Sequence, residues 1–369
     1  MSDNSLLYKI AISLIPGVGS MNAKKLIAYT GSIEGIFREK KQSLLKIPGI
    51  GEVISNEIAN SNVLSKAENE IKFIEKNGIK AKFYLDKDYP GRLKHCADSP
   101  IIIFIKGKVN LDSQKIISVV GTRHATDYGK NFCNKFVSRL AELKHDTVIV
   151  SGLAYGIDIA AHKAALKSGL PTIAVLAHGL KTIYPASHAR YAREIIDHGA
   201  LVTEFASDVF ADRAFFVRRN RIIAGLSDAT IVVESGEKGG ALITADIANS
   251  YNRDVFAVPG RIEDTMSKGC NKLIKTNKAI LLEKIEDLEY QMNWELSEQK
   301  PKAIQRELFV EISEDEKCIF EMIRNSNEIS IDNLCIEVEM PVSKVSPILL
   351  SLEFSGLIRS LPGKIYKLV

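Results

Sequence analysis

Several common features are missing from this sequence of 369 residues, and each absence removes a class of protein. No apolar run reaches the ~18–20 residues that a membrane-spanning helix needs. The N-terminus, MSDNSLLYKI, lacks the basic start and long apolar stretch of a secretion signal. The five cysteines are scattered and never form a CxxC pair: Cys96, Cys133, Cys270, Cys318 and Cys335. We therefore predict a cytoplasmic protein without a membrane segment, a disulfide framework or a zinc site.

The usual nucleotide-binding motifs are also missing. No GxGxxG follows a predicted strand, and the nearest approach to a P-loop, Gly236–Ala241, lacks the Lys-Ser/Thr pair. No group of histidine, cysteine and acidic residues has the spacing of metal ligands. We therefore predict no bound dinucleotide, no magnesium nucleotide held in the usual way, no metal and no other cofactor.

Charge is unevenly distributed along the chain. From Leu308 to Val369 there are ten acidic and six basic side chains, whereas the remainder has 43 basic and 35 acidic ones. Phosphate-binding surface is therefore expected upstream of residue 308.

The first part of the chain, residues 1–75, reads as short helices interrupted by two tight turns, Pro16–Gly19 and Pro48–Gly51. Apolar residues precede each turn and a helical pattern follows it. This arrangement resembles paired helix-hairpin-helix motifs, in which turn glycines offer backbone amides to a DNA phosphate. A structural or docking role is favoured over DNA contact here. The candidate DNA-contacting residues are Gly17, Gly19, Gly49 and Gly51.

Residues 80–292 form the second predicted domain. A strand is expected at Ile101–Ile105, and from residue 116 short apolar, β-branched runs alternate with amphipathic stretches. Continuous apolar strands separated by helices predict a parallel sheet covered on both faces. The predicted strands are Ile116–Val120, Thr147–Val150, Thr172–Leu176, Leu201–Thr203, Ala229–Val233, Val255–Val258 and Ala279–Leu282.

Residues 293–313 are polar and include Pro301, which predicts a linker. Three helical stretches then run to about Gly356, and two strands are expected around Pro362-Gly363, so residues 314–369 resemble a winged helix. The helix expected to read DNA, Pro341–Ser355, has Lys344 and Glu353 as its only charges. A protein-contact or regulatory role is therefore favoured over DNA binding for this module.

Glycine follows five of the predicted parallel strands, in sequences such as SVV-Gly121 and VIVS-Gly152. These junctions all meet at the carboxyl edge of the sheet, where ligands bind in such folds. Glycine lets a phosphate approach free backbone amides, and helix N-termini behind the loops favour anions. Ordinary turn chemistry is the alternative, but five such junctions favour a phosphate-binding edge.

The segment Asp212–Arg221 has four arginines and two phenylalanines. Guanidinium groups pair with phosphates and stack on bases, and phenylalanine rings stack as well, which suits a flexible polyanion with exposed bases. A solvated basic helix with Phe215 and Phe216 in the core is the alternative.

These motifs together resemble the bacterial DNA-processing protein A family, also called Smf. They are VVGTR (119–123), SGLAYGIDIAAH (151–162), AVLAHGLKTIYP (174–185), RRNRIIAGLSDATIVVE (218–234), GGALITA (239–245), VFAVPG (255–260) and SKGCNKLI (267–274). The resemblance implies a homodimeric, extended Rossmann-like α/β domain that binds single-stranded DNA. It also implies help in loading a RecA-type recombinase onto that DNA during natural transformation.

From the motifs and the resemblance we predict the residues that contact DNA. They are Gly121, Thr122, Arg123, Ser151, Gly152, Lys181, Arg218, Arg219, Asn220, Arg221, Gly239, Gly240 and Lys268. The chain departs from the family pattern at several positions. Lys181 replaces an acid and adds positive charge, whereas Val217 replaces a proline that usually precedes the Arg-Asn-Arg sequence of the expected arginine loop.

A Rossmann-like enzyme related to nucleoside-monophosphate phosphoribohydrolases is the alternative function. Those enzymes carry a PGGxGTxxE loop, and the comparable stretch here, Glu237–Asp246, lacks the proline, the GT pair and the glutamate. Glu204 and Glu234 end strands at the ligand edge, where we expect them to order loops by accepting N–H bonds. We expect His162 to be a packed helix residue and Asp158 to be a helix cap. The sequence therefore favours a binding protein without catalytic residues.

Overall fold

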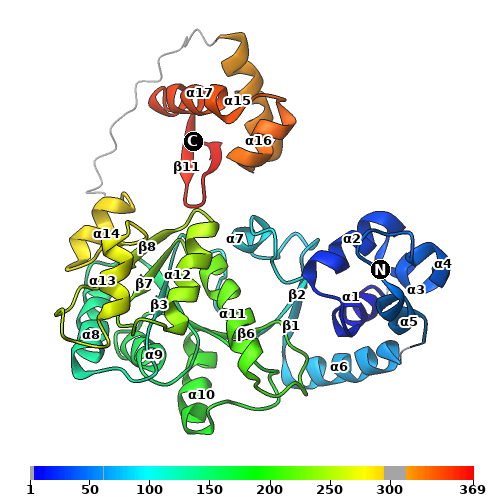
Figure 1. Ribbon diagram of the computed structural model, residues 1–369, viewed down its shortest axis with the longest axis horizontal. Coiled ribbons are helices and arrows are strands. Elements are labelled where there is room, and N and C mark those ends of the chain that lie inside the picture. The colour runs from blue at the N-terminus through cyan, green and yellow to red at the C-terminus, as the bar shows by residue number, and fades with distance from the viewer. Residues whose placement is uncertain (1–3, 61, 295–312) are drawn as a thin grey trace.

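The computed structural model describes residues 4–60, 62–294 and 313–369 (Figure 1). A helical domain lies beside one end of a large sheet domain, and a small C-terminal module lies against another side of it (Figure 1). No helix within these ranges is long and apolar enough to cross a membrane.

The helical domain contains the two predicted glycine turns. One joins α1 (Asn4–Leu14) to α2 (Ser20–Thr30), and the other joins α4 (Lys41–Leu44) to α5 (Glu52–Asn60). Gly17 and Gly49 have φ angles of 76° and 88°, a left-handed conformation that glycine adopts readily. Apolar residues within each turn are buried, while these glycines are exposed. The domain is completed by α3 (Ile33–Arg38) and α6 (Val63–Asn77).

The sheet has nine strands in the order β1-β2-β6-β5-β4-β3-β7-β8-β9. Strands β3 to β9 are mutually parallel, as predicted, and β1 and β2 extend the sheet in antiparallel pairing on the side of the helical domain. The strands are β1 (Lys80–Phe83), β2 (Ile102–Gly107), β3 (Lys115–Val120), β4 (Thr147–Ser151), β5 (Thr172–Val175), β6 (Ala200–Thr203), β7 (Ala229–Val232), β8 (Asp254–Ala257) and β9 (Ile280–Leu281).

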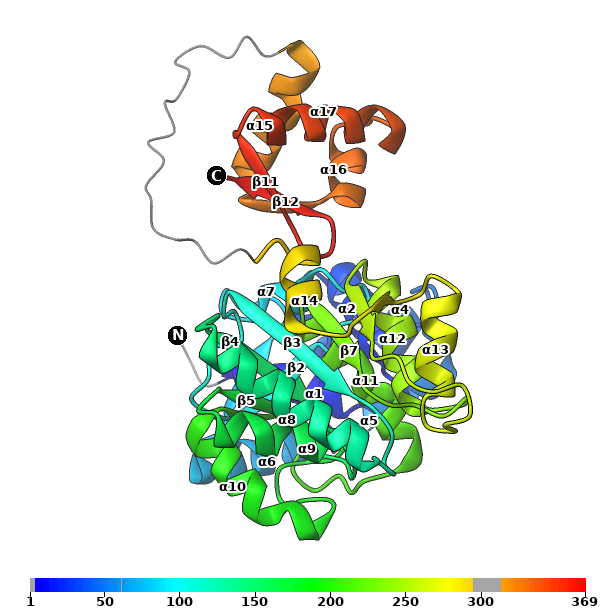
Figure 2. The same cartoon turned by 90° about the vertical axis from the view of Figure 1, so that its left-hand side faces the viewer.

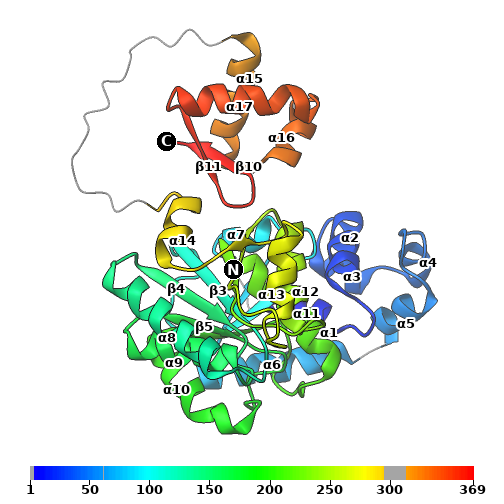
Figure 3. The same ribbon diagram turned by 60° about the vertical axis from the view of Figure 1, so that its left-hand side comes forward.

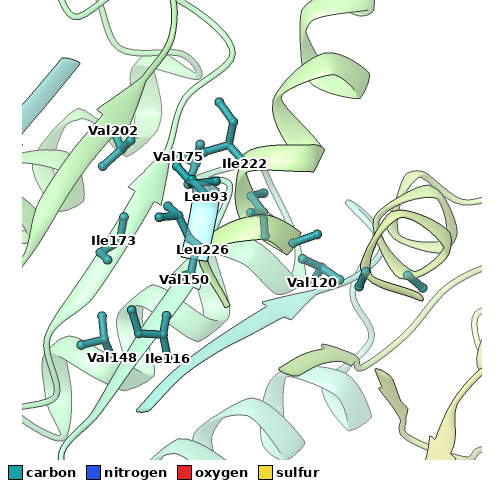
Figure 4. Close-up of a cluster of buried hydrophobic side chains, with 14 of the residues drawn as sticks. Leu93, Ile116, Val120, Val148, Val150, Ile173, Val175, Val202, Ile222 and Leu226 are labelled. Carbon is teal, nitrogen blue, oxygen red and sulfur yellow. The ribbon is translucent and has the colours of Figure 1, made fainter. Parts of the chain in front are cut away.

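Helices cover both faces of the sheet, so alternate strand residues enter two different cores. Val148 and Val150 of β4 pack with Ile222 and Leu226 toward one set of helices, while Ile149 packs toward the other (Figure 4). This two-sided burial explains the continuous apolar runs. The first set is α7 (Gly91–Lys94), α11 (Arg213–Leu226), α12 (Gly240–Ser250) and α13 (Lys268–Lys275); the second is α8 (Asp127–Glu142), α9 (Ile157–Lys167), α10 (Ala189–His198) and α14 (Ile285–Gln291).

Trp294 lies at the boundary of the sheet domain. Its side chain is only 8% exposed and packs with the core beneath α8 and α14, and the Lys115 ammonium lies 4.8 Å from its ring centroid. Residues 293 and 294, which composition assigns to the linker, therefore belong to the sheet domain. Residues 295–312 of that predicted linker lie outside the described residues, and its last residue, Ser313, is the N-cap of the helix Glu314–Ser326.

The C-terminal module has the predicted winged-helix order of three helices and a hairpin. A short strand, β10, adds to the hairpin and gives the sheet order β10-β12-β11. Ile319, Leu334 and Leu349 lie in a core of its own. The elements are α15 (Glu314–Ser326), β10 (Glu328–Ser330), α16 (Ile331–Glu337), α17 (Val342–Phe354), β11 (Ile358–Leu361) and β12 (Ile365–Leu368).

The hairpin of this module points at the sheet domain (Figures 2 and 3). At its tip the Pro362 carbonyl accepts a 2.6 Å hydrogen bond from Arg253, which directly precedes β8. A Cβ at Gly363 would lie 3.1 Å from the Arg253 guanidinium carbon, so this glycine allows the close approach. The module thus contacts the amino edge of the parallel strands.

Candidate nucleic-acid interface

A crevice of about 920 Å³ opens at the carboxyl edge of the sheet. The chain runs outward from β3 through β4 and β5 to β6, then returns to place β7 on the other side of β3. Ligands in open α/β sheets bind at such a reversal of strand order, because the loops after the two neighbouring strands diverge. The crevice is lined by the loops after β3 and β4, by α11 and by the start of α12.

The loop after β3 forms one wall. A Cβ at Gly121 would lie 2.4 Å from the Ile157 side chain, so only glycine lets the start of α9 pack this close to the loop. Thr122 follows, and its amide donates to the Glu234 carbonyl at 2.7 Å. The Arg123 side chain is exposed in the crevice, with its guanidinium carbon 4.8 Å from the Phe216 ring centroid. No ion pair joins Arg123 to any residue that the structure describes.

The N-terminus of α12 forms the opposite wall. Gly239 is its N-cap, and Gly240 begins the helix with no atom within 4 Å of an ideal Cβ. The first amides of a helix lack partners within it and carry partial positive charge, which suits an anion. Lys238 also lines this wall and is exposed. Sequence reasoning missed Lys238, although its place directly before a glycine pair was a usable signal.

The arginine segment is helical, which corrects the expectation of an arginine loop. Asp212 caps α11 by accepting a 2.8 Å hydrogen bond from the Ala214 amide. The helix directs Arg213, Phe216 and Asn220 into the crevice. Tyr184 also lines it, with its ring centroid 5.9 Å from that of Phe216. Because the helix turns by about 100° per residue, neighbouring arginines face different surroundings.

Arg219 is the buried floor of the crevice. It is 3% exposed and donates to the carbonyls of Gly152, at 2.7 Å, and Val175. Burial lowers its pKa to about 10, while nearby Asp158 acts in the opposite direction. Arg219 therefore organises the crevice, and only a small part of it can meet a ligand.

Ser151 and Gly152 were predicted to contact DNA, but both are buried. The Ser151 hydroxyl donates to the Val119 carbonyl at 2.6 Å. A Cβ at Gly152 would lie 2.4 Å from a terminal guanidinium nitrogen of Arg219. This glycine therefore makes room for the arginine rather than for a ligand.

Arg221 is also buried, which places it away from the crevice lining. It donates to Glu204 at 2.6 Å and to the Asp98 carbonyl at 2.5 Å. The same Glu204 oxygen accepts from Arg218 at 2.7 Å, and the Arg218 side chain remains 46% exposed. Glu204 thus orders this region through two arginines instead of through backbone N–H groups.

The other polar residues noted in the sequence serve the fold. Glu234 accepts from the Thr126 amide at 2.9 Å and the Thr126 hydroxyl at 2.5 Å. Asp158 is not the predicted helix cap, because Gly156 is the N-cap of α9. It lies in the first turn of that helix, where it accepts from the Ala154 amide at 3.3 Å and burial raises its pKa. His162 is fully buried, with its Nδ1 atom 2.7 Å from the Thr172 hydroxyl oxygen. Burial lowers the pKa of His162 to about 3. The imidazole is therefore neutral at physiological pH.

The remaining predicted residues lie apart from the crevice lining. Lys181 is exposed in the loop after β5, and Lys268 is exposed at the start of α13. The turn glycines that the sequence offered as further DNA contacts are in the helical domain, where a Cβ at Gly49 would lie 3.6 Å from the Lys25 ammonium. The structure thus brings together the seven crevice residues Gly121, Thr122, Arg123, Arg219, Asn220, Gly239 and Gly240.

Comparison with known proteins covers most of the chain. Residues 80–293 match the family model of DNA recombination-mediator protein A, and residues 300–364 match that of the DprA winged helix domain. Protein Smf of Escherichia coli is 37% identical over 282 residues, which are 74% of this chain and 74% of that protein.

Two solved structures of related proteins resemble this one. DNA processing protein A (DprA) of Streptococcus pneumoniae matches with a TM-score of 0.62 and 31% identity, over 79% of this chain and 98% of that one. The Helicobacter pylori protein matches with a TM-score of 0.53 and 27% identity, over 58% and 96% of the two chains. The predicted Rossmann-like fold, the winged helix and the family resemblance are thereby confirmed, and this chain belongs to the DNA recombination-mediator protein A family, also known as DprA or Smf.

Proposed function

We propose that this protein binds single-stranded DNA in the crevice without changing it chemically, and helps to load a RecA-type recombinase onto that DNA during natural transformation. The observation that carries the proposal is the pairing of two kinds of group in one crevice. Backbone amides at Gly240 and the exposed Arg123 suit phosphates, while Phe216 and Tyr184 suit the faces of unpaired bases.

The relatives support this choice of ligand. The Helicobacter pylori structure is described by its single-stranded DNA binding mode. We expect this protein to act likewise in the cytoplasm, where incoming DNA and the recombinase meet, and to do so as a homodimer. Sedimentation velocity would measure the oligomeric state, and a monomer at micromolar concentration would contradict that part.

The carboxylates near the crevice support a binding role over the phosphoribohydrolase alternative. Glu204 and Glu234 lie outside the crevice lining and are engaged by two arginines and by Thr126. Asp158 does line the crevice, but it is only 7% exposed and accepts from a backbone amide. A general acid or base needs a proton-accepting atom directed at the substrate. A nucleotide-release assay on nucleoside monophosphates separates the two functions, since base release above background would support the enzyme.

A salt-titrated binding assay tests the proposed ligand. Fluorescence anisotropy would compare a labelled oligothymidylate with a duplex of equal length. We expect tighter binding of the single strand, little sequence dependence, and a log–log salt slope of roughly −0.7 for each phosphate neutralised. Equal affinity for the duplex would overturn the proposal. Loading is tested by the rate of recombinase filament formation on single-stranded DNA with and without this protein, which should rise when it is present.

A further inference from the structure

An exposed aromatic residue lies beside the crevice on the loop between β6 and α11, residues 204–212, which we call the Phe210 loop. Phe210 itself is 74% exposed. The next two residues of the loop, Ala211 and Asp212, line the crevice. A strand that leaves the crevice on this side would therefore pass close to the Phe210 loop.

The Phe210 loop is held in place at several points. The Gly179 amide donates to the Val209 carbonyl at 2.8 Å, and the Lys181 amide donates to the Ser207 carbonyl at 3.3 Å. These bonds fix the loop against the loop that follows β5. An exposed ring on a tethered loop loses little conformational freedom when a ligand stacks on it.

The helical domain supplies a further tether. Glu70 of α6 is buried, and its carboxylate accepts from the Ser207 amide at 3.0 Å and from the Ser207 hydroxyl at 2.7 Å. Burial raises the pKa of Glu70. One carboxylate from another domain thus holds the middle of the Phe210 loop.

Positive charge is available around this loop. Lys181 is exposed on the neighbouring loop. Arg218 lies one helical turn into α11 and is half-exposed. Glu204 accepts a hydrogen bond from its guanidinium group, whose carbon atom lies 5.3 Å from the Phe205 ring centroid. Both cations lie outside the crevice lining, so the crevice does not account for them.

We propose that single-stranded DNA continues from the crevice across the Phe210 loop, where a base stacks on Phe210 and Lys181 and Arg218 contact flanking phosphates. Glu70 is a positioning residue through which the helical domain sets this stacking surface. The inference rests on the proposed function, because it extends the path of the same ligand. Alternating aromatic and basic groups are the usual surface for unpaired nucleotides.

Intrinsic fluorescence provides the direct test. The only tryptophan of the chain, Trp294, is buried, so its emission can be subtracted using the parent protein. Phe210→Trp should be quenched on adding oligothymidylate, because a stacked base quenches indole emission. Phe354→Trp, at an 82% exposed position on the winged helix, is the matched control and should not respond. No quenching at position 210 in the presence of bound DNA would overturn the proposal.

Affinity distinguishes this proposal from the proposed function. Phe210→Ala should weaken oligothymidylate binding by about five- to tenfold, within the usual effect of losing one stacked base, and Phe210→Tyr should retain affinity. Unchanged affinity in Phe210→Ala alongside weakened binding in Arg123→Ala would reject the stacking surface and leave the crevice standing. If Phe210→Ala shifts the sedimentation coefficient and leaves affinity intact, the ring is a protein contact and the proposal fails. A parent protein without single-strand preference would instead reject the function itself.

The positioning role of Glu70 has its own measurement. In the Phe210→Trp background, adding Glu70→Ala should reduce DNA quenching and lower affinity by roughly threefold, less than losing the stacked base itself, while Glu70→Gln should restore both. Glu68→Ala, at an exposed position on the same helix, is the control for the helix surface. A purely structural role would lower the melting temperature of Glu70→Ala without changing quenching per folded molecule, and that result would overturn the assignment.

Discussion

The carboxyl edge and the amino edge of the sheet each carry an arginine, but one side chain is exposed and the other is buried and hydrogen-bonded. At the carboxyl edge Arg123 is exposed in an open crevice and stacks on Phe216. At the amino edge Arg253 is 4% exposed and donates hydrogen bonds to the carbonyls of Pro362 and Arg92. One edge leaves a cation for a ligand, whereas the other uses its cation to hold the winged helix.

This difference shows why a count of basic residues is a poor guide to a binding surface. A buried arginine whose donors are taken up by backbone carbonyls or a carboxylate cannot pair with phosphate without breaking those bonds. The same distinction exists within one helix, where Arg213 faces the crevice and Arg219 lies beneath it. Substitutions that separate fold from binding can test this comparison directly.

The largest expected effect is on stability, at Arg219. Arg219→Ala removes two hydrogen bonds to backbone carbonyls and leaves the nearby buried Asp158 without its compensating charge. We expect the free energy of unfolding to fall by about 3–5 kcal/mol, measured by urea denaturation. Arg213→Ala, at an exposed crevice position, should change it by less than about 0.5 kcal/mol. Equal stability of the two variants would contradict the assignment of Arg219 to the fold.

A charge placed at the other wall of the crevice should affect binding only. Gly240→Asp adds a carboxylate where an ideal Cβ has no neighbour within 4 Å. An acid in the first turn stabilises a helix slightly, so the melting temperature should hold or rise. Repulsion of phosphate should weaken single-strand binding by about 2–3 kcal/mol, or roughly 30- to 150-fold. Gly240→Asn is the neutral control, and an equal loss in both variants would point to shape instead of charge.

Arg123→Ala should give a similar or smaller loss of binding with the fold unchanged. Removing one charge-assisted phosphate contact is expected to cost about 1.5–3 kcal/mol. Glu204 and Glu234, the carboxylates that could have paired with Arg123, are engaged by other residues. Anisotropy and thermal melting would be measured on the same sample, with His124→Ala as the exposed neighbour control. A large drop in melting temperature with binding per folded molecule intact would instead make Arg123 a structural residue.

The sequence predicted the parallel strands well because burial on both faces leaves an unmistakable pattern. Runs such as Val148–Val150 are apolar throughout, and their glycine junctions mark the carboxyl edge. Strand β1 escaped prediction because its sequence, Lys80-Ala-Lys-Phe83, alternates lysine with alanine and phenylalanine at the border of the sheet. Its burial depends on the helical domain packed against it.

Whether each predicted site residue is buried or exposed was harder to predict from the sequence. The three arginines Arg218, Arg219 and Arg221 read alike in sequence as one basic cluster. Which face of α11 meets the sheet decides that Arg219 and Arg221 are buried. Local sequence does not fix which face that is, since it depends on how the helix packs against the core. Ser151 shows the same limit, because a strand-end residue can point into the protein or into the crevice.

The smallest expected effect on single-strand affinity comes from removing the winged-helix module at the amino edge. Deleting residues 308–369 removes a module with ten acidic and six basic residues, together with its hydrogen bond to Arg253. Its core is separate from those of the sheet domain, so the deletion should not open them. Its contact is at the edge opposite the crevice, and its net negative charge slightly repels DNA.

We therefore expect single-strand affinity of the truncated protein to stay within about threefold of the parent, or ~0.7 kcal/mol, with any change toward tighter binding at low salt. Arg253→Ala in the full chain provides a milder comparison, because it removes the hydrogen bond to Pro362 but keeps the module. A folded truncated protein that loses tenfold or more in affinity would mean that the winged helix contacts DNA despite its charge. In that case the amino edge would hold a second DNA-binding element in place, and the division between the two edges would be wrong.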